Sequence, residues 1–562
     1  MARLDFKGKA FVQNHHLTLK YHHLVPNKAA SLTDKVSLHD NLIIHGDNLV
    51  ALKALLPTYA GKVKCIYIDP PYNTGNEGWV YNDNVNSPMM KEWLGKVVDK
   101  EDLTRHDKWL CMMMPRLKLL HELLSVYGIL FVSIDHNEAH HLKMLLDEVF
   151  TESNFVGTII WKGATDNNPT QIATEHEYIY CFAKNKPSIL SIWKNKTSNA
   201  KEIMLSEYER LKSLFQADVE KIQQGFRQFI KANYESLNPI THYNLVDSKG
   251  IYTGSRKVHN PKLGGYKYDV IHSNGKVCTP PANGYRYPKK AMDALLEEDR
   301  IIFGKNEIQV IQIKEYLIDY EAKLSSVILL DSRTGSNDLQ ALFPGEAKPF
   351  PNPKPVDLIH YIFGFCTEKD DIILDSFAGS GTTAQAVLSL NKEAGGGRKF
   401  ILIETENYAE TLTAERVRRV IQGVPNSKDE SLKKGLGGAF SFFDLGEPIE
   451  MQAILQGDNL PTYEELARYV FYTATGEEFD PSQIDLERKY IGTSKDFEVY
   501  LFYQPDLKYP KATALNLQLA EQLGKDKKKL VFAPMKYLDQ DHLNDYKIDY
   551  CQLPFEIYKS RN

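Results

Sequence analysis

The stretch VKCIYIDPPYNTG, residues 63–75, decides the fold. It starts as a nearly continuous apolar run that ends at Asp69, which is typical of a parallel strand buried on both faces. The loop that follows therefore starts at the carboxyl edge of a sheet, where open α/β folds bind their ligands. Pro70 and Pro71 fix the backbone and remove two N–H donors, which leaves the Asp69 carboxylate and the Pro70 carbonyl as rigid acceptors beside the Tyr72 ring. We predict a catalytic loop of Asp69, Pro70, Pro71 and Tyr72 that is suited to bind an NH₂ group.

Strand and helix patterns alternate around this loop. The predicted elements are a strand and a helix in NLIIHGDNLVALKALL (41–56), a helix in WLCMMMPRLKLLHELLSVYG (109–128) closed by Gly128, a strand in YGILFVSID (127–135), a helix in HNEAHHLKMLLDEVF (136–150) and a strand in HEYIYCFAKN (176–185). This alternation predicts an α/β core. No role is predicted for His136, for which a satisfied histidine is the expected state.

A second candidate site is the Gly-rich turn DSFAGSGTT, residues 375–383, which again follows a strand and opens a helix. Such a turn lets the backbone approach a cofactor closely, and the helix N-terminus favours a carboxylate. The chain contains no G-x-x-x-x-G-K-[ST] motif, so we expect no ATP motor in it. Glu404 ends the next strand, where an acid can accept ribose hydroxyls; a surface acid is the alternative. The candidate cofactor residues here are Asp375, Phe377, Gly379, Gly381, Thr382 and Glu404.

The segment between these two sites has a different pattern. Residues 201–232 predict one long, charged amphipathic helix that ends near Ala232. Residues 241–290 then hold nine lysines and arginines against two acids, interleaved with tyrosines, a mixture suited to phosphate pairing and base stacking. A solvated basic face is the alternative. The candidate nucleic-acid contacts are Lys257, Lys262, Tyr266, Lys267, Arg286 and Lys289.

The bulk composition limits the remaining possibilities. A chain of 562 residues is long enough for several domains, and its net charge of −5 requires any nucleic-acid surface to be local. The six cysteines lie far apart without a C-x-x-C pair, so we expect neither a disulfide scaffold nor a metal site. No uncharged apolar run approaches 18 residues, so we expect a cytoplasmic protein without a membrane segment.

Taken together, these motifs resemble those of the β-class amino methyltransferases, in which the catalytic loop precedes the recognition region and the cofactor glycines come last. The longer phrases look most like the modification (Mod) subunit of type III restriction-modification systems; they are IHGDNLVALKALL, IDPPYNTGNEG, EHEYIYCFAKN, FPNPKPVDLIHYI and DSFAGSGTTAQAV. The resemblance covers residues 41–185 and 343–423. It implies a Rossmann-like S-adenosyl-L-methionine-dependent enzyme that methylates N6 of a flipped adenine in double-stranded DNA. It also implies a homodimer.

Individual residues match the motifs of that family. The resemblance assigns Asp69, Pro70 and Tyr72 to the flipped adenine, and it assigns Phe377, Gly379, Gly381 and Glu404 to the methionine and ribose parts of the cofactor. Asn352 and Lys354, in FPNPKP, match a segment that closes over the cofactor. Asp47, in HGDN, matches a residue that reaches the adenine of the cofactor.

The expected fold class is α/β, a Rossmann-like methyltransferase core with an inserted α+β target-recognition domain and a small C-terminal α/β domain. The expected domains are an N-terminal segment 1–40, a core formed by 41–185 and 343–440, a recognition domain 186–342 and a C-terminal domain 441–562 for dimerisation or partner docking. The C-terminal domain is a candidate contact for a restriction subunit. Methylation of cytosine N4, and a catalytically silent recognition subunit, are the alternative functions. The DNA sequence that is recognised cannot be predicted.

Overall fold

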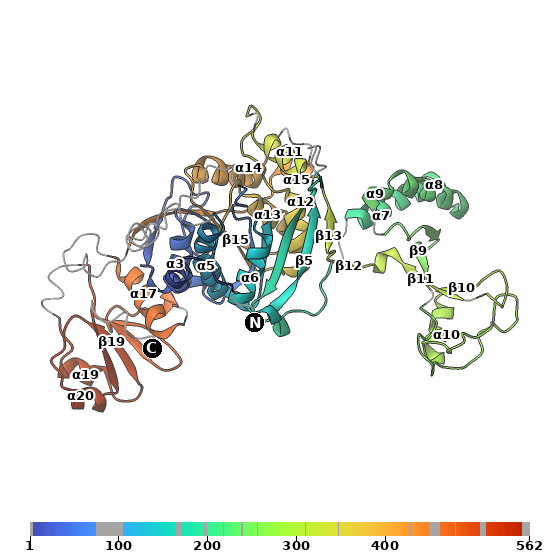
Figure 1. Cartoon of the computed structure of the whole chain (residues 1–562). Helices are drawn as coiled ribbons and strands as arrows, with labels where there is room; N and C mark the ends of the chain where they lie inside the picture. The colour runs from blue at the N-terminus through green and yellow to red at the C-terminus, as the bar shows by residue number, and fades with distance from the viewer. Residues whose placement is uncertain are drawn as a thin grey trace. The chain divides into compact units, whose positions relative to one another are not determined.

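The protein is described by a computed structural model, which covers residues 4–74, 105–163, 171–195, 199–216, 218–237, 240–255, 257–309, 311–346, 348–425, 427, 429–448, 461–477, 479–505 and 513–553. Gly75, the last residue of the stretch that decides the fold, and Arg256 of the basic segment lie outside these ranges. The chain forms two compact units (Figure 1), Met1–Ser191 with Ser325–Asn562 and Ile192–Leu324.

The first unit is built on a ten-stranded sheet. Its strands, in spatial order, are β1 (His22–Pro26), β16 (Ser441–Pro448), β2 (Leu42–His45), β15 (Lys399–Glu404), β14 (Ile372–Asp375), β3 (Val63–Ile68), β4 (Leu124–Ile134), β6 (His176–Ala183), β5 (Phe155–Lys162) and β13 (Val327–Leu329). From β16 to β4 every neighbouring pair is parallel, whereas β6 is antiparallel to both of its neighbours. This topology confirms the predicted α/β core.

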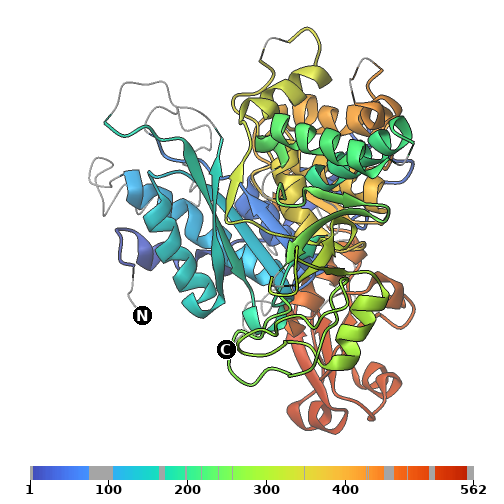
Figure 2. The same cartoon turned by 90° about the vertical axis from the view of Figure 1, so that its right-hand side faces the viewer.

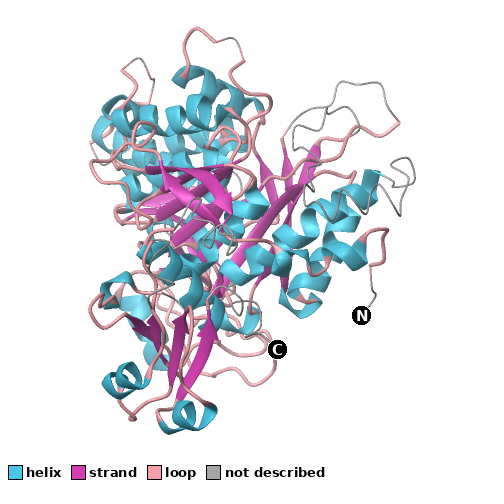
Figure 3. Ribbon diagram, turned by 90° about the vertical axis from the view of Figure 1, so that its left-hand side faces the viewer, coloured by secondary structure: helices cyan, strands magenta, loops and turns pink. Residues whose placement is uncertain are grey.

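Helices cover both faces of this sheet (Figure 3). They include α3 (Asn48–Tyr59), α5 (Arg105–Leu123), α6 (Ala139–Phe150), α12 (Val356–Cys366), α13 (Thr382–Ala394) and α14 (Glu415–Gln422). Adjacent residues of β3 belong to opposite faces, because Ile66 packs into the core shared with α3, α5 and α6 while the Tyr67 ring lies 6.4 Å from that of Phe363 in α12. Burial on both sides explains why the strand sequence is apolar throughout.

The chain reverses its direction of winding between β14 and β3. From β3 it passes through α5 to β4 on one side, and from β14 it passes through α13 to β15 on the other side. In open α/β sheets, such a switch point leaves a crevice at the carboxyl ends of the two strands. The predicted catalytic loop and the Gly-rich turn follow β3 and β14 directly, so both start at this switch point.

The predicted end of one helix in this unit is wrong. The helix expected to close at Gly128 ends at Leu123, and β4 begins at once at Leu124. Leu124 pairs with Val63 of β3, and its carbonyl accepts a hydrogen bond from Lys184 Nζ at 2.7 Å. Sheet pairing, which depends on residues distant in the sequence, outweighs the helical pattern of this short stretch.

The second unit, Ile192–Leu324, falls within the segment 186–342 where a recognition domain is expected. Figure 2 shows its helices and small sheet in green and yellow-green. Its elements are α7 (Asn199–Leu214), α8 (Val219–Ala232), α9 (Tyr234–Leu237), α10 (Lys289–Glu297), a sheet of β10 (Ile301–Ile302), β11 (Gln312–Tyr316), β9 (Gly250–Ser255) and β8 (Leu245–Asp247), and the pair β7 (Lys194–Asn195) and β12 (Ala322–Lys323).

The single helix predicted for residues 201–232 is wrong, because the structure has two helices there. Asp218 caps the second one, its side chain accepting a hydrogen bond from the backbone N–H of Lys221 at 3.2 Å. The two helices pack against each other through a shared apolar core that contains Leu211 and Phe226. The broken helix therefore buries apolar side chains that a straight one would expose.

The expected domain boundaries differ from the structure at two places. β13 and α11 (Arg333–Leu342), assigned to the recognition segment, belong to the first unit. β16, assigned to the C-terminal domain, is a strand of the large sheet. The rest of that domain has α17 (Tyr463–Thr475), α19 (Leu517–Leu523), α20 (Gln540–Asp545) and a sheet of β17 (Tyr490–Thr493), β18 (Glu498–Leu501), β19 (Lys529–Ala533) and β20 (Ile548–Gln552). None of the described helices combines the length and apolar character that crossing a bilayer requires.

Candidate active site

The loop after β3 is held in place by residues of α5. Trp109 donates its indole Nε1–H to the carbonyl of Pro71 at 2.6 Å. Asn73 is buried and has a φ of 59°, a left-handed conformation that Asn adopts more readily than most residues. Its side-chain amide donates to the carbonyl of Arg105 at 3.2 Å. These contacts fix the backbone that carries Asp69.

Four side chains converge where the loop begins. Lys354 Nζ lies 2.7 Å from Asp69 Oδ2, 3.3 Å from Glu177 Oε2 and 2.9 Å from Tyr72 Oη. Tyr72 Oη lies 2.8 Å from Asp69 Oδ1 and 2.7 Å from Glu177 Oε2. The single hydroxyl proton serves one carboxylate at a time, whereas the ammonium has three protons for its three oxygen partners. The lysine therefore holds the network together.

Charge and burial keep this network in one ionic state. Burial by itself lowers the pKa of Lys354, but the charges of Asp69 and Glu177 outweigh it and raise that pKa above its usual value. Burial, together with the same two carboxylates, raises the pKa of Tyr72 well above its usual range. Lys354 is thus a cation and Tyr72 a neutral donor at neutral pH. The ammonium also lies 5.0 Å from the centroid of the Tyr72 ring, within reach of a cation–π contact.

The Gly-rich turn after β14 is held from within. Asp375 Oδ1 accepts a hydrogen bond from the backbone N–H of Phe377 at 3.0 Å, and its Oδ2 accepts one from Thr383 Oγ1 at 2.6 Å. Burial raises the pKa of Asp375 to about 7. Gly379 and Gly381 both have left-handed φ values, 51° and 81°, which glycine adopts without strain. The Asp375 carboxylate, predicted to bind the cofactor, therefore supports the turn instead of facing outward.

Glu404 ends β15 and reaches the same turn. Its Oε2 accepts a hydrogen bond from the backbone N–H of Gly379 at 2.7 Å, and its Oε1 accepts one from the N–H of Glu406 at 3.0 Å. The residue is fully buried, so it is not a surface acid. Burial raises the pKa of Glu404 to about 7, despite the backbone hydrogen bonds that lower it. Its carboxylate thus lies directly beside the glycines of the turn.

One edge of the sheet therefore carries an acid–proline–proline–tyrosine loop and, on the adjacent strand, a glycine turn with a buried acid. The family model described as DNA methylase matches residues 63–415, more than half of the chain, and spans both. The chain belongs to the DNA methylase family. The matched segment also includes the whole second unit.

This DNA methylase is similar in sequence to the following three proteins. The type III restriction-modification enzyme EcoP15I Mod subunit of Escherichia coli is 41% identical over 68% of this chain and 61% of its own length. The StyLTI Mod subunit of Salmonella typhimurium is 29% identical over 74% of this chain and 62% of its own length. The type II methyltransferase M.KpnI of Klebsiella pneumoniae is 31% identical over 64% of this chain and 80% of its own length. The chain spans about three fifths of the length of the two Mod subunits it matches.

Lys354 and Asn352, both predicted at the cofactor, lie in different surroundings. The Lys354 side chain belongs to the Asp69 network, while its backbone carbonyl accepts a hydrogen bond from Thr382 Oγ1 at 3.2 Å. It therefore connects the loop after β3 to the Gly-rich turn of the methylase. Asn352 is exposed, with a φ of 51°. The assignment of Lys354 to the cofactor alone missed its ion pair.

Asp47 of the methylase has a structural contact that the sequence analysis did not predict. Its carboxylate caps α3 by accepting hydrogen bonds from the backbone N–H groups of Leu49 and Val50 at 2.8 and 3.2 Å. The same carboxylate lies 3.8 Å from the guanidinium of Arg116. Asp47 thus stabilises the start of α3.

Arg416 is a further residue of this site that sequence reasoning missed. It is fully buried, and its guanidinium donates to Ser380 Oγ at 2.8 Å and to Thr382 Oγ1 at 2.9 Å. Burial lowers the pKa of Arg416 to about 10, so it stays charged at neutral pH. A buried cation beneath the Gly-rich turn makes the start of α13 favourable for an anionic ligand group. The only signal for Arg416 in the sequence is its position in the helix after Glu404. The stretch ERVRRVIQ predicts a helix with basic residues, but it does not indicate which arginine is buried.

The six predicted nucleic-acid contacts of the methylase all lie in the second unit. Four are exposed and have no ion-pair partner among the residues that the structure describes, namely Lys262, Tyr266, Lys267 and Arg286. Two are exposed but paired. Lys257 Nζ lies 2.5 Å from Glu315 Oε1, and Lys289 Nζ lies 3.8 Å from Asp293 Oδ1. Acids outside the basic segment thus neutralise part of its charge.

Proposed function

We propose that this DNA methylase transfers a methyl group from S-adenosylmethionine to N6 of an adenine in double-stranded DNA. The observation that carries the proposal is the position of Asp69 and of the Gly-rich turn at the ends of the adjacent strands β3 and β14. Their common edge brings the acceptor for an amino group beside the site for a cofactor.

The residues of the Gly-rich turn fit the cofactor. A Cβ atom at Gly379 would lie 3.2 Å from the Phe350 ring, and one at Gly381 would lie 3.3 Å from Thr413, so both positions need glycine to keep the turn open. When bound, the cofactor supplies a methyl group on a sulfonium that an amine attacks. Glu404 would accept the ribose hydroxyls, and the start of α13 above Arg416 would face the methionine carboxylate.

The catalytic loop would orient the amine. The N6 lone pair of adenine is delocalised into the ring, so the amine is a poor nucleophile. Acceptance of its two protons by the Asp69 carboxylate and the Pro70 carbonyl would favour a pyramidal nitrogen and free the lone pair for attack. Asp69 acts here as an oriented acceptor, and positioning supplies most of the acceleration. Tyr72 would stack on the base, which must leave the duplex to reach the loop.

The wider assignment rests on the names of the relatives. We propose that the protein is the modification and recognition subunit of a type III-like restriction-modification system, in line with the EcoP15I and StyLTI Mod subunits. The second unit would read the DNA. A homodimer and a separate restriction subunit belong to this proposal, as does a cytoplasmic location, where the DNA of the cell would be the substrate.

The defining experiment identifies the methylated base. The protein is incubated with labelled S-adenosylmethionine and double-stranded DNA of mixed sequence, and the DNA is then digested and sequenced. We expect label in N6-methyladenine within one sequence context. Label in N4-methylcytosine would identify the other amine substrate, and DNA without label would overturn the proposal.

Asp69→Ala tests the role of the loop. We expect methyl transfer to fall by about a hundredfold or more, because the oriented acceptor is lost. Affinities for DNA and for S-adenosylhomocysteine, measured by calorimetry, should stay within error. The matched control is Asp370→Ala, an exposed acid at the amino end of β14, which should leave all three quantities unchanged. An equal loss of cofactor affinity in Asp69→Ala would show that its role is misassigned.

Gly379→Val tests the turn and should have the opposite effect. A branched side chain at a φ of 51° is strained and would meet Phe350. We expect cofactor affinity to be lost while DNA affinity is kept. Retention of cofactor binding by a folded Gly379→Val protein would place the cofactor elsewhere.

A further inference from the structure

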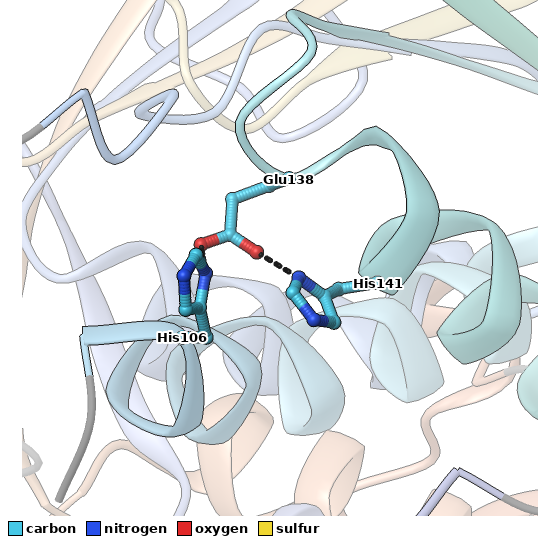
Figure 4. A group of neighbouring side chains, drawn as sticks. All are labelled: His106, Glu138 and His141. Carbon is cyan, nitrogen blue, oxygen red and sulfur yellow. Dashed lines mark hydrogen bonds and ion pairs between the residues drawn. The ribbon is translucent and has the colours of Figure 1, made fainter.

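Next to the catalytic loop lies a cluster of two histidines and one glutamate (Figure 4). Glu138 precedes α6, His141 lies in its first turn and His106 is the second residue of α5. The Nδ1 atom of His106 lies 2.7 Å from Glu138 Oε1, and that of His141 lies 2.8 Å from Glu138 Oε2. One ligand atom from each residue falls within 4.8 Å of the others. Both imidazoles therefore face the Glu138 carboxylate, one at each oxygen.

The burial of Glu138 demands a positive partner. None of its side chain is exposed, whereas the two imidazoles are 35% and 37% exposed. Buried carboxylates in proteins are paired with a cation or coordinate a metal ion. No lysine or arginine reaches this one among the residues that the structure describes; its side-chain partners there are the two imidazoles and the amide of Asn73.

We propose that His106, Glu138 and His141 form a binding site for a Zn²⁺ ion. Two imidazole nitrogens and one carboxylate are a ligand set that zinc accepts, and the nitrogen ligands disfavour Mg²⁺ and Ca²⁺. Tetrahedral coordination places neighbouring N and O ligands about 3.3 Å apart, so the three ligand atoms, which lie within 4.8 Å of one another, have to rearrange around the ion. The partly exposed imidazoles leave a path for the ion and for a water ligand.

The site would connect the starts of two helices to the catalytic loop. Its ligands come from the start of α5 and the start of α6, and Glu138 also accepts a hydrogen bond from Asn73 of the loop. A metal ion would hold this carboxylate in one position and, through it, the loop. The cysteine spacing that argued against a metal site does not bear on these residues. Only the effect on catalysis rests on the proposed function; binding of the ion does not.

Zinc binding to the full chain tests the proposal. The protein is stripped with a chelator and titrated with Zn²⁺ by calorimetry, and with Co²⁺ to record the absorption bands of its coordination. We expect saturable binding of one ion with bands typical of four-coordinate Co²⁺, and a rise in melting temperature with Zn²⁺. His141→Ala should lower the affinity by at least about tenfold, and Glu138→Gln should remove the thermal shift.

His140→Ala is the matched control, because this neighbouring histidine is exposed and outside the cluster. It should bind zinc as the parent protein does. If the parent protein binds no zinc, or if His141→Ala binds it equally well, the proposal is wrong and the imidazoles serve only as hydrogen-bond partners of Glu138. If Glu138→Gln does not fold, His141→Ala still decides the question. The measurements need neither DNA nor S-adenosylmethionine, so they stand even if the protein methylates nothing.

Discussion

Glu404 is an acid with no exposed surface, placed where a strand meets the glycine turn. Its two oxygens accept backbone N–H groups from Gly379 and Glu406, so it is satisfied as a hydrogen-bond acceptor while its charge is poorly solvated. The folded protein therefore favours the protonated form, with a pKa of about 7 against a usual 4.5. Its contribution to stability is fully present below pH 4.5 and is lost as the pH rises through about 7.

Glu404→Gln should reveal this linkage. Glutamine does not titrate, so the stability of the variant relative to the parent should improve between pH 5 and 8, by on the order of 3 kcal/mol. Urea unfolding at several pH values measures the difference. Glu410→Gln, an exposed acid of the same segment, should show no such trend. A parallel pH dependence of the parent and the Glu404→Gln protein would show that folding does not raise the pKa of this carboxyl group.

At the scale of single elements, Asp47 at the start of α3 has one observed role and one proposed role. Asp47 caps the helix through two backbone N–H groups, and about a third of its side chain, 34%, remains exposed at the same edge of the sheet as the cofactor turn. A short side chain with one oxygen can keep the cap but cannot reach a ligand as a carboxylate does.

The pair Asp47→Ala and Asp47→Ser separates these roles. We expect Asp47→Ala to lower the free energy of unfolding by about 1 kcal/mol and Asp47→Ser to keep nearly all of it. Both should weaken binding of S-adenosylhomocysteine by about tenfold, because both remove the carboxylate. Denaturant midpoints and calorimetry measure the two effects. If Asp47→Ser binds the cofactor as the parent does, Asp47 is a cap alone.

Elements that are defined by a local sequence pattern could be predicted from the sequence. The strands at 63–68, 372–375 and 399–404 are apolar runs that end at or just before an acid, and the order of the loops places Asp69 and Gly379 at one sheet edge. The pairing of Tyr72 with Glu177 and Lys354 could not be predicted, because these partners are 105 and 282 residues away in the chain. The same holds for the early end of α5, which a strand partner decides.

At the scale of the whole molecule, charge is divided between the two units. Residues 192–324 hold 21 lysines and arginines against 16 acids, whereas the rest of the chain holds 47 against 57. A protein with a net charge of −5 thus carries a unit with a net charge of +5. This unit also contains the exposed Tyr266 and three exposed cations without an ion-pair partner among the described residues, Lys262, Lys267 and Arg286, as a phosphate-binding surface would require. The nine basic residues against two acids at 241–290 overstate the local charge of that segment, because Glu307 and Glu315 of the same unit pair with two of its lysines in space.

Two lysines of this unit should differ in their contribution to DNA affinity. Lys267 is exposed without an ion-pair partner among the described residues, whereas Lys276 lies 3.1 Å from Glu307. Lys267→Gln should weaken DNA binding uniformly across sequences and reduce the slope of log affinity against log salt by about 0.9. Lys276→Gln should change this slope by less than half as much. Fluorescence anisotropy with a labelled duplex over a range of salt concentrations measures both slopes, and equal slopes would contradict the pairing.

The ammonium of Lys354 has a further consequence. It donates to Asp69 and to Glu177, so the acceptor of the catalytic loop is already occupied by a nitrogen of the protein's own chain. In the proposed reaction, a base that binds Asp69 has to replace the N–H donor of Lys354 there with an N–H donor of its own. A base with a carbonyl at that position would place its oxygen against the Asp69 carboxylate. The network would therefore favour an amino group before any base enters.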